Sequence, residues 1–184
     1  MSIFSSKKLK QQEKQEEAEA GIKKYTVLLV DDEQANLDVM ASLLNQSCHI
    51  LTALNGPLAL EVIAELGDKE LSMVISDQRM PLMSGVELLE KIAVLRPDTL
   101  RLVVSGYCEM NAVLEAINKA KIYHFFTKPF EPADFLATVE QALTTYELKQ
   151  SMESQINSLQ QQLKSYKQSQ ASTKKIMEDG LSNG

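Results

Sequence analysis

From Tyr25 onward, uninterrupted apolar runs alternate along the chain with segments of helical periodicity. Runs without interposed polar residues are typical of strands that are buried on both faces of a sheet. The runs are YTVLLV (25–30), HILTAL (49–54), LSMVIS (71–76), LRLVVS (100–105) and YHFF (123–126). Strand and helix alternate five times, which predicts an α/β domain with a doubly wound sheet of five parallel strands.

Five helices are expected between and after these strands, because apolar residues recur there at spacings of three and four. They are predicted at 33–46, 57–66, 85–95, 110–120 and 132–149. The last helix has no obvious end, since neither Gly nor Pro occurs between Pro132 and Lys167.

Beyond the domain, Met152, Ile156, Leu159, Leu163 and Tyr166 are spaced four, three, four and three residues apart. This is the repeat of a coiled coil, and a parallel dimer would bury it. A frayed helical tail is the alternative, because the repeat is short. We therefore predict four parts: a flexible polar tail at 1–23, the α/β domain at 24–147, a coiled-coil extension at 148–168 and a disordered tail at 169–184.

Composition narrows the class of protein. The chain has 184 residues, 19 Lys and Arg against 25 Asp and Glu, and a net charge of -6. This charge argues against a nucleic-acid binder, which needs a basic face, and against a basic membrane-surface helix. No apolar run approaches the roughly 20 residues that span a bilayer, and the N-terminus lacks a secretory core. The two cysteines give no metal spacing. We expect a cytoplasmic protein.

Polar residues follow the apolar runs at their C-terminal ends: Asp31 and Asp32, Asp77, Ser105, and Lys128. Ligands of doubly wound sheets bind at that edge. Three gathered carboxylates favour a hard cation such as Mg2+, and a carboxylate like that of Asp77 can attack a phosphoryl group. Asp31 and Asp32 could instead cap the following helix, which explains them alone but not the whole set.

Four motifs together resemble the receiver domain of two-component response regulators, over about residues 24–147. They are VDDE (30–33), DQRMPLMSG (77–85), VVSGY (103–107) and FFTKPF (125–130). The resemblance implies a flavodoxin-like fold, a cis Lys128–Pro129 bond, and Asp77 as the residue that accepts a phosphoryl group.

The same resemblance implies roles for the other residues of the site. Asp32 and Asp77 would bind Mg2+ directly, Asp31 through water, and Arg79 through its backbone carbonyl. Ser105 and Lys128 would hold phosphoryl oxygens, and Ser105 and Phe125 would move together as a switch. The side chains of Arg79 and Tyr107 occupy positions that control water access to the acyl phosphate, which suggests slow hydrolysis.

The implied function is a signalling switch rather than an enzyme. Asp77 would be phosphorylated by a histidine kinase or a phosphotransfer protein, and the change would alter protein contacts or dimer packing. The expected dimer uses the surface formed by the helix at 110–120, the strand at 123–126 and the helix at 132–149, together with the coiled coil. The alternative is the truncated input module of a larger effector enzyme: a cyclic-di-nucleotide synthase or phosphodiesterase, or an ATPase.

Overall fold

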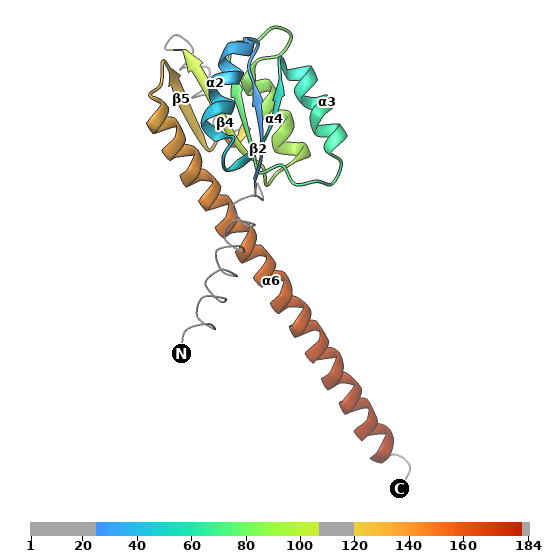
Figure 1. The fold of residues 1–184 in the computed structure, drawn as a ribbon. Coiled ribbons are helices and arrows are strands. Elements are labelled where there is room, and N and C mark those ends of the chain that lie inside the picture. The colour runs from blue at the N-terminus through green and yellow to red at the C-terminus, as the bar shows by residue number, and fades with distance from the viewer. Residues whose placement is uncertain (1–24, 107–119, 182–184) are drawn as a thin grey trace, which may run out of the picture. The chain divides into compact units, whose positions relative to one another are not determined.

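The computed structural model describes residues 25–106 and 120–181. The strands in this part of the chain are β1 (Tyr25–Val30), β2 (Cys48–Ala53), β3 (Met73–Asp77), β4 (Leu100–Gly106) and β5 (His124–Lys128). They form one parallel sheet in the order β2-β1-β3-β4-β5 (Figure 1). The prediction of a five-stranded, doubly wound parallel sheet is confirmed.

Four helices occur among the described residues: α2 (Gln34–Leu44), α3 (Gly56–Leu66), α4 (Gly85–Leu95) and α6 (Pro132–Leu181). The fifth helix expected from the sequence, at 110–120, lies outside the described residues except for Ala120. The predicted tail at 1–23, Tyr107 and Cys108 also lie outside them. No helix in the described part of the chain is long and apolar enough to cross a membrane.

The sheet carries an apolar layer on each face, as continuous apolar strands require. On one face, Val27 and Leu29 of β1 pack with Leu37 and Met40 of α2 and with Phe135 of α6. Their neighbours along β1, Leu28 and Val30, point to the opposite face and join residues of α3 and α4. The successive side chains of a strand alternate between faces, so one apolar run supplies both layers.

The loop between β3 and α4 is held in place by its own polar groups and by a glycine. Ser84 and Glu87 form a capping box at the start of α4. Gly85 lies so close to β3 that an added Cβ would be 2.2 Å from the carbonyl oxygen of Asp77. This approach fixes the end of β3, and thereby Asp77, against the first turn of α4.

Helix α6 extends further than the sequence pattern indicated. We expected no regular structure at 169–184, but α6 continues to Leu181. The helix persists because the first strong breaker after Pro132 is Gly180, and backbone propensity alone sustains it where the apolar repeat has ended. The chain divides into two compact units, one ending at Leu143 and one comprising Thr144–Gly184.

Candidate functional site

The predicted aspartates and Lys128 line one cavity at the carboxyl edge of the sheet, whereas Ser105 is not among its lining residues. Its volume is about 410 Å³, and it is lined by Asp31, Asp32, Glu33, Asp77, Arg79, Gly106 and Lys128. The cavity lies where β1 and β3 are neighbours and the strand order reverses direction. This switch point is where open α/β sheets bind their ligands.

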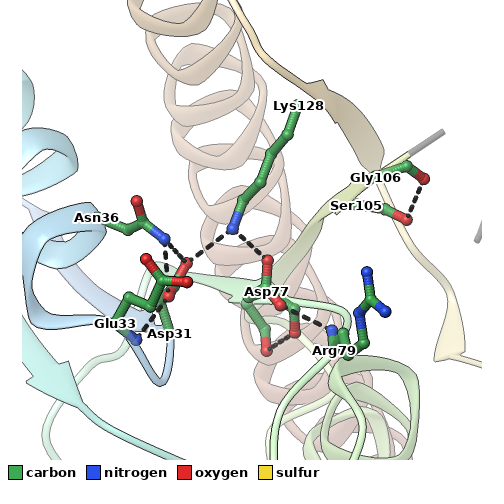
Figure 2. A network of polar contacts seen from close by, with 9 residues as sticks. Asp31, Glu33, Asn36, Asp77, Arg79, Ser105, Gly106 and Lys128 are labelled. Atoms are coloured by element: carbon green, nitrogen blue, oxygen red, sulfur yellow. Dashed lines mark hydrogen bonds and ion pairs between the residues drawn. The ribbon is translucent and has the colours of Figure 1, made fainter.

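Lys128 joins the carboxylates of two different strands (Figure 2). Its Nζ lies 3.0 Å from Oδ2 of Asp31 and also forms an ion pair with Oδ1 of Asp77. Lys128 reaches this point from the end of β5, and the Lys128–Pro129 peptide bond after it is cis, as the resemblance implied. One ammonium group thus neutralises part of the charge of two buried carboxylates.

Asp31 is 1% exposed, so its charge needs several donors. Besides Lys128, the backbone N–H of Glu33 donates to Oδ1 at 2.9 Å. The side-chain amide of Asn36 donates to Oδ1 and Oδ2 at 3.0 and 3.1 Å. The sequence analysis did not single out Asn36; its position in the first turn of the helix that follows the two aspartates was the available signal.

Asp77 ends β3 and is 7% exposed. Its Oδ2 accepts a hydrogen bond of 2.7 Å from the backbone N–H of Arg79, and Oδ1 contacts Lys128. Burial raises the pKa of Asp77 above its ordinary value of 3.8, and the nearby charge of Asp31 adds to the rise, while Lys128 and the Arg79 N–H oppose it. The anionic form of Asp77 is therefore less stable than that of an exposed aspartate. A cation bound in the cavity would stabilise it.

The pKa of Lys128 is also raised, although burial acts on it in the opposite direction. Burial by itself lowers the pKa of Lys128, but the hydrogen bonds and the charges of Asp77 and Asp31 outweigh it and raise the pKa above 10.5. The ammonium group therefore stays protonated throughout the neutral range. It can act as a fixed positive charge beside any group carried by Asp77.

Ser105 and Phe125 lie on β4 and β5, next to the site. Ser105 is buried, and its hydroxyl donates to the carbonyl of Gly106 at 3.2 Å (Figure 2). Phe125 is half-buried and packs against the apolar layer that contains Val103 and Ala120. Strand pairing places Phe125 opposite Val103, two residues before Ser105. Ser105 and Phe125 are thus close together on the two neighbouring strands β4 and β5 at one edge of the sheet.

The donors of the cavity suit a hard divalent cation. No three Asp, Glu, His or Cys side chains among the described residues are grouped tightly enough to hold a metal by themselves. Mg2+ does not need such a group, because it typically keeps several waters and takes one or two carboxylates. Asp31, Asp32 and Asp77, with oxygen atoms only and lining one cavity, fit that requirement.

Arg79 and Asp32 complete the rim of the cavity. Both residues are exposed, whereas Asp31 and Asp77 are buried. The structure thus brings the predicted residues Asp31, Asp32, Asp77, Arg79 and Lys128 together around one cavity. The arrangement provides a buried carboxylate, an ammonium group in contact with it and a rim of charged residues that is accessible to solvent.

Comparison with known proteins agrees with this fold. The sequence profile of the response regulator receiver domain matches residues 27–140. The hydrogenase transcriptional regulatory protein HoxA of Cupriavidus necator is 34% identical over 130 residues, which are 71% of this chain and 26% of HoxA. The chain therefore spans about a quarter of the length of this relative.

Two solved structures are also similar to the chain. An uncharacterized protein from Neptuniibacter caesariensis is 38% identical with a TM-score of 0.63, over 71% of this chain and 95% of that one. The adenylate cyclase from Rhodopirellula baltica is 28% identical with a TM-score of 0.66, over 72% and 96%.

The five-stranded parallel sheet and the cavity at its switch point agree with the profile match. The chain belongs to the response regulator receiver domain family. Domains of this family are regulatory modules of two-component systems, and they typically depend on Mg2+ and phosphorylation. The predicted family and fold are confirmed.

Proposed function

We propose that Asp77 accepts a phosphoryl group from a phosphohistidine of a histidine kinase or phosphotransfer protein. In this step an Asp77 carboxylate oxygen forms a bond to phosphorus while the N–P bond of the donor breaks. The histidine nitrogen recovers the bonding electron pair, and Asp77 becomes an acyl phosphate. Later attack by water releases inorganic phosphate and restores the carboxylate.

One observation carries this proposal: Lys128 contacts Asp77 and Asp31 at once, inside a cavity open to solvent. A phosphoryl group on Asp77 would replace a single carboxylate charge by about −1.5 to −2 charges with strong acceptor oxygens. Lys128 already contacts Oδ1 of Asp77, one of the two oxygens that could carry the phosphoryl group. Phosphoryl transfer depends chiefly on positioning and on such charge stabilisation.

Mg2+ would be held by Asp32 and Asp77 directly, by Asp31 through water and by the backbone carbonyl of Arg79. When bound, the ion neutralises the charge that develops on the phosphoryl oxygens. Within the chain itself, Lys128 and the Ser105 hydroxyl hold two of those oxygens. Ser105 then leaves the Gly106 carbonyl, its present partner.

The output is a change of protein contacts. When Ser105 turns toward the phosphoryl group, Phe125 on the neighbouring strand follows into the space that Ser105 vacates. Phe125 is half-buried and already contacts the apolar layer, so a small rotation changes the surface beside β5. A covalent phosphate shifts such an equilibrium because it interacts with one state only.

The second compact unit supplies a dimer contact. The side chains of Met152, Ile156, Leu159, Leu163 and Tyr166 are 51–64% exposed on α6. Isolated apolar residues are common on surfaces, but these five follow a heptad repeat. Ile156 and Leu159 occupy its a and d positions, a combination that favours two strands. A second copy of the chain is the partner that this repeat fits.

Labelling by a small N–P donor tests the proposal. The full chain is incubated with phosphoramidate and Mg2+, and acid-labile phosphate on the protein is measured. We expect incorporation in the wild type and in Asp68→Asn, which removes an exposed aspartate outside the cavity, and none in Asp77→Asn. Equal incorporation in Asp77→Asn would place the acceptor elsewhere and overturn the proposal.

A further inference from the structure

Asn36 makes a two-point contact with the most deeply buried carboxylate of the site. It lies in the first turn of α2, five residues after Asp31, and is half-buried. Its side-chain amide donates to both carboxylate oxygens of Asp31, at 3.0 and 3.1 Å (Figure 2). An amide that contacts both oxygens fixes the plane of the carboxylate as well as its position.

Lys128 serves two carboxylates, and this creates a competition. Its ammonium group contacts Asp31 and Asp77 together. A phosphoryl group on Asp77 would draw Lys128 toward the new oxygens, because charge-assisted hydrogen bonds to phosphate are strong. Asp31 is 1% exposed and would then lose the positive charge of Lys128. A buried carboxylate without donors is unstable.

Asn36 and the Glu33 N–H remain on Asp31 in that state. Both donors belong to the start of α2, so they stay in place when Lys128 contacts the phosphoryl group, and the Glu33 N–H lies 2.9 Å from Oδ1. They can hold the carboxylate in the same orientation before and after Lys128 turns away. The side chain of Asn36 is therefore placed to keep Asp31 available to a hydrated cation in the cavity.

We infer that Asn36 is a positioning residue for the phosphoryl-transfer site, which orients Asp31 and satisfies it when Lys128 engages the phosphoryl group. The inference rests on the proposed function of Asp77 and adds a residue to it. Partners that orient metal-associated carboxylates typically change metal affinity or activity 10–100-fold when they are removed. The effect of losing Asn36 should thus appear in the response to Mg2+.

The test compares Asn36→Leu with Gln34→Leu in the full chain. Leucine has the same branched arrangement of side-chain heavy atoms as asparagine but donates no hydrogen bond. Gln34 is the matched control, since its amide lies on the same helix turn but donates to the exposed Asp38 at 2.9 Å. Mg2+ binding to the unphosphorylated protein is measured by calorimetry, and labelling by acetyl phosphate is measured over a range of Mg2+ concentrations.

We expect Asn36→Leu to weaken Mg2+ binding by about tenfold or more, and Gln34→Leu to bind like the wild type. The Mg2+ concentration for half-maximal labelling should rise in parallel, with a much smaller change in the rate at saturating Mg2+. A purely structural role for Asn36 would lower stability without this separation. Equal Mg2+ affinity in Asn36→Leu and the wild type would overturn the inference.

A second readout applies even if Asn36→Leu folds poorly. In the wild type, the side-chain amide signals of Asn36 in a proton–nitrogen spectrum should shift when Mg2+ is added, and a spectrum in which they do not move would contradict the inference. A wild-type chain that binds Mg2+ but takes up no phosphoryl group would contradict the proposed function alone. The two failures are therefore distinguishable.

Discussion

The ammonium nitrogen of Lys128 lies 3.0 Å from Oδ2 of Asp31, although the two residues are 97 positions apart in the chain. β5 delivers the lysine and the end of β1 delivers the aspartate, so the contact exists only in the folded sheet. Asp77 of β3 contacts the same ammonium group. Lys128 thus offsets part of the negative charge of both carboxylates. Its removal tests how this positive charge affects metal binding and phosphorylation.

Replacing Lys128 by alanine should have opposite effects on metal binding and on phosphorylation. Two unit charges about 4 Å apart interact by about 1 kcal/mol even in water, so loss of the lysine should tighten Mg2+ binding by roughly fivefold or more. Labelling of Asp77 by acetyl phosphate should fall steeply at the same time. Calorimetry measures Mg2+ binding and labelling measures phosphorylation on the same sample. Weaker Mg2+ binding in Lys128→Ala would contradict the expectation that Lys128 and Mg2+ compete for the same carboxylates.

Asp77→Asn should stabilise the fold at neutral pH in Mg2+-free buffer with a chelator. Burial raises the folded-state pKa of Asp77 above its ordinary value of 3.8. As the pH rises through this range, the unfolded chain ionises first, so the stability present at low pH is lost as the carboxylate becomes charged. Asparagine resembles the protonated form and avoids that loss.

The stability difference between Asp77→Asn and the wild type should therefore shrink toward zero as the pH falls below 3.8. Urea denaturation across pH measures it. A difference that stays constant with pH would mean that the ionisation of Asp77 is not its cause.

Gly85→Ala should destabilise the domain by about 1–3 kcal/mol, as overpacking of a close contact does. An added Cβ would lie 2.2 Å from the backbone oxygen of Asp77, which cannot move without moving β3. Gly56→Ala is the control. Its Cβ would meet the flexible side chain of Met83 at 2.8 Å, so the loss should be smaller. The midpoints of urea denaturation compare the stabilities of the two variants, provided that the dependence on urea is the same. A larger loss in Gly56→Ala than in Gly85→Ala would contradict this account of the loop.

Leu159→Glu should convert a dimer into a monomer. If the apolar residues of α6 pack against a second copy, the change removes two buried leucines from each dimer. At about 1.5–3 kcal/mol for each leucine, the dissociation constant should rise about a hundredfold or more. Sedimentation velocity measures the association state, with Gln161→Glu as a control outside the repeat. A wild-type chain that is monomeric at all concentrations would refute the dimer.

The sequence predicted most of the fold because each level of evidence agreed. Continuous apolar runs predicted the five strands. The rule that ligands bind at the carboxyl ends of parallel strands then singled out Asp31, Asp77 and Lys128, which follow three of these runs. Parallel strands place their carboxyl ends at one edge, so the position of a residue along its strand was sufficient. The helix at 33–46 was likewise expected from its spacing alone, and α2 occupies Gln34–Leu44.

Two residues show what the apolar pattern did not indicate. The contact of Asn36 with Asp31 depends on how the first turn of α2 returns over Asp31, which periodicity does not describe. Arg101 stands in the apolar run of β4 and is 6% exposed. Its side chain donates to backbone carbonyls of the segments that precede β4 and β5, namely those of Arg96, Pro97, Thr99, Ala120 and Lys121. Burial lowers the pKa of Arg101, and the charge of Asp98 opposes this.

The end of α6 was misjudged for a different reason. The apolar repeat ends at Tyr166, and we took the end of the repeat as the end of order. Helix formation needs only suitable backbone propensity once a helix has been nucleated, and the residues after Tyr166 contain no Pro and no Gly before Gly180. The end of the apolar repeat is thus not the end of the helix, which continues to Leu181.

The central claim is that Asp77 carries an acyl phosphate, and borohydride trapping tests it most directly. The full chain is treated with acetyl phosphate and Mg2+, reduced with borohydride, digested, and examined by mass spectrometry. Reduction converts a phosphorylated aspartate to homoserine, so the account predicts homoserine at position 77 and nowhere else. Homoserine at another aspartate, or an unchanged peptide containing Asp77 in a sample that has taken up phosphate, would contradict it.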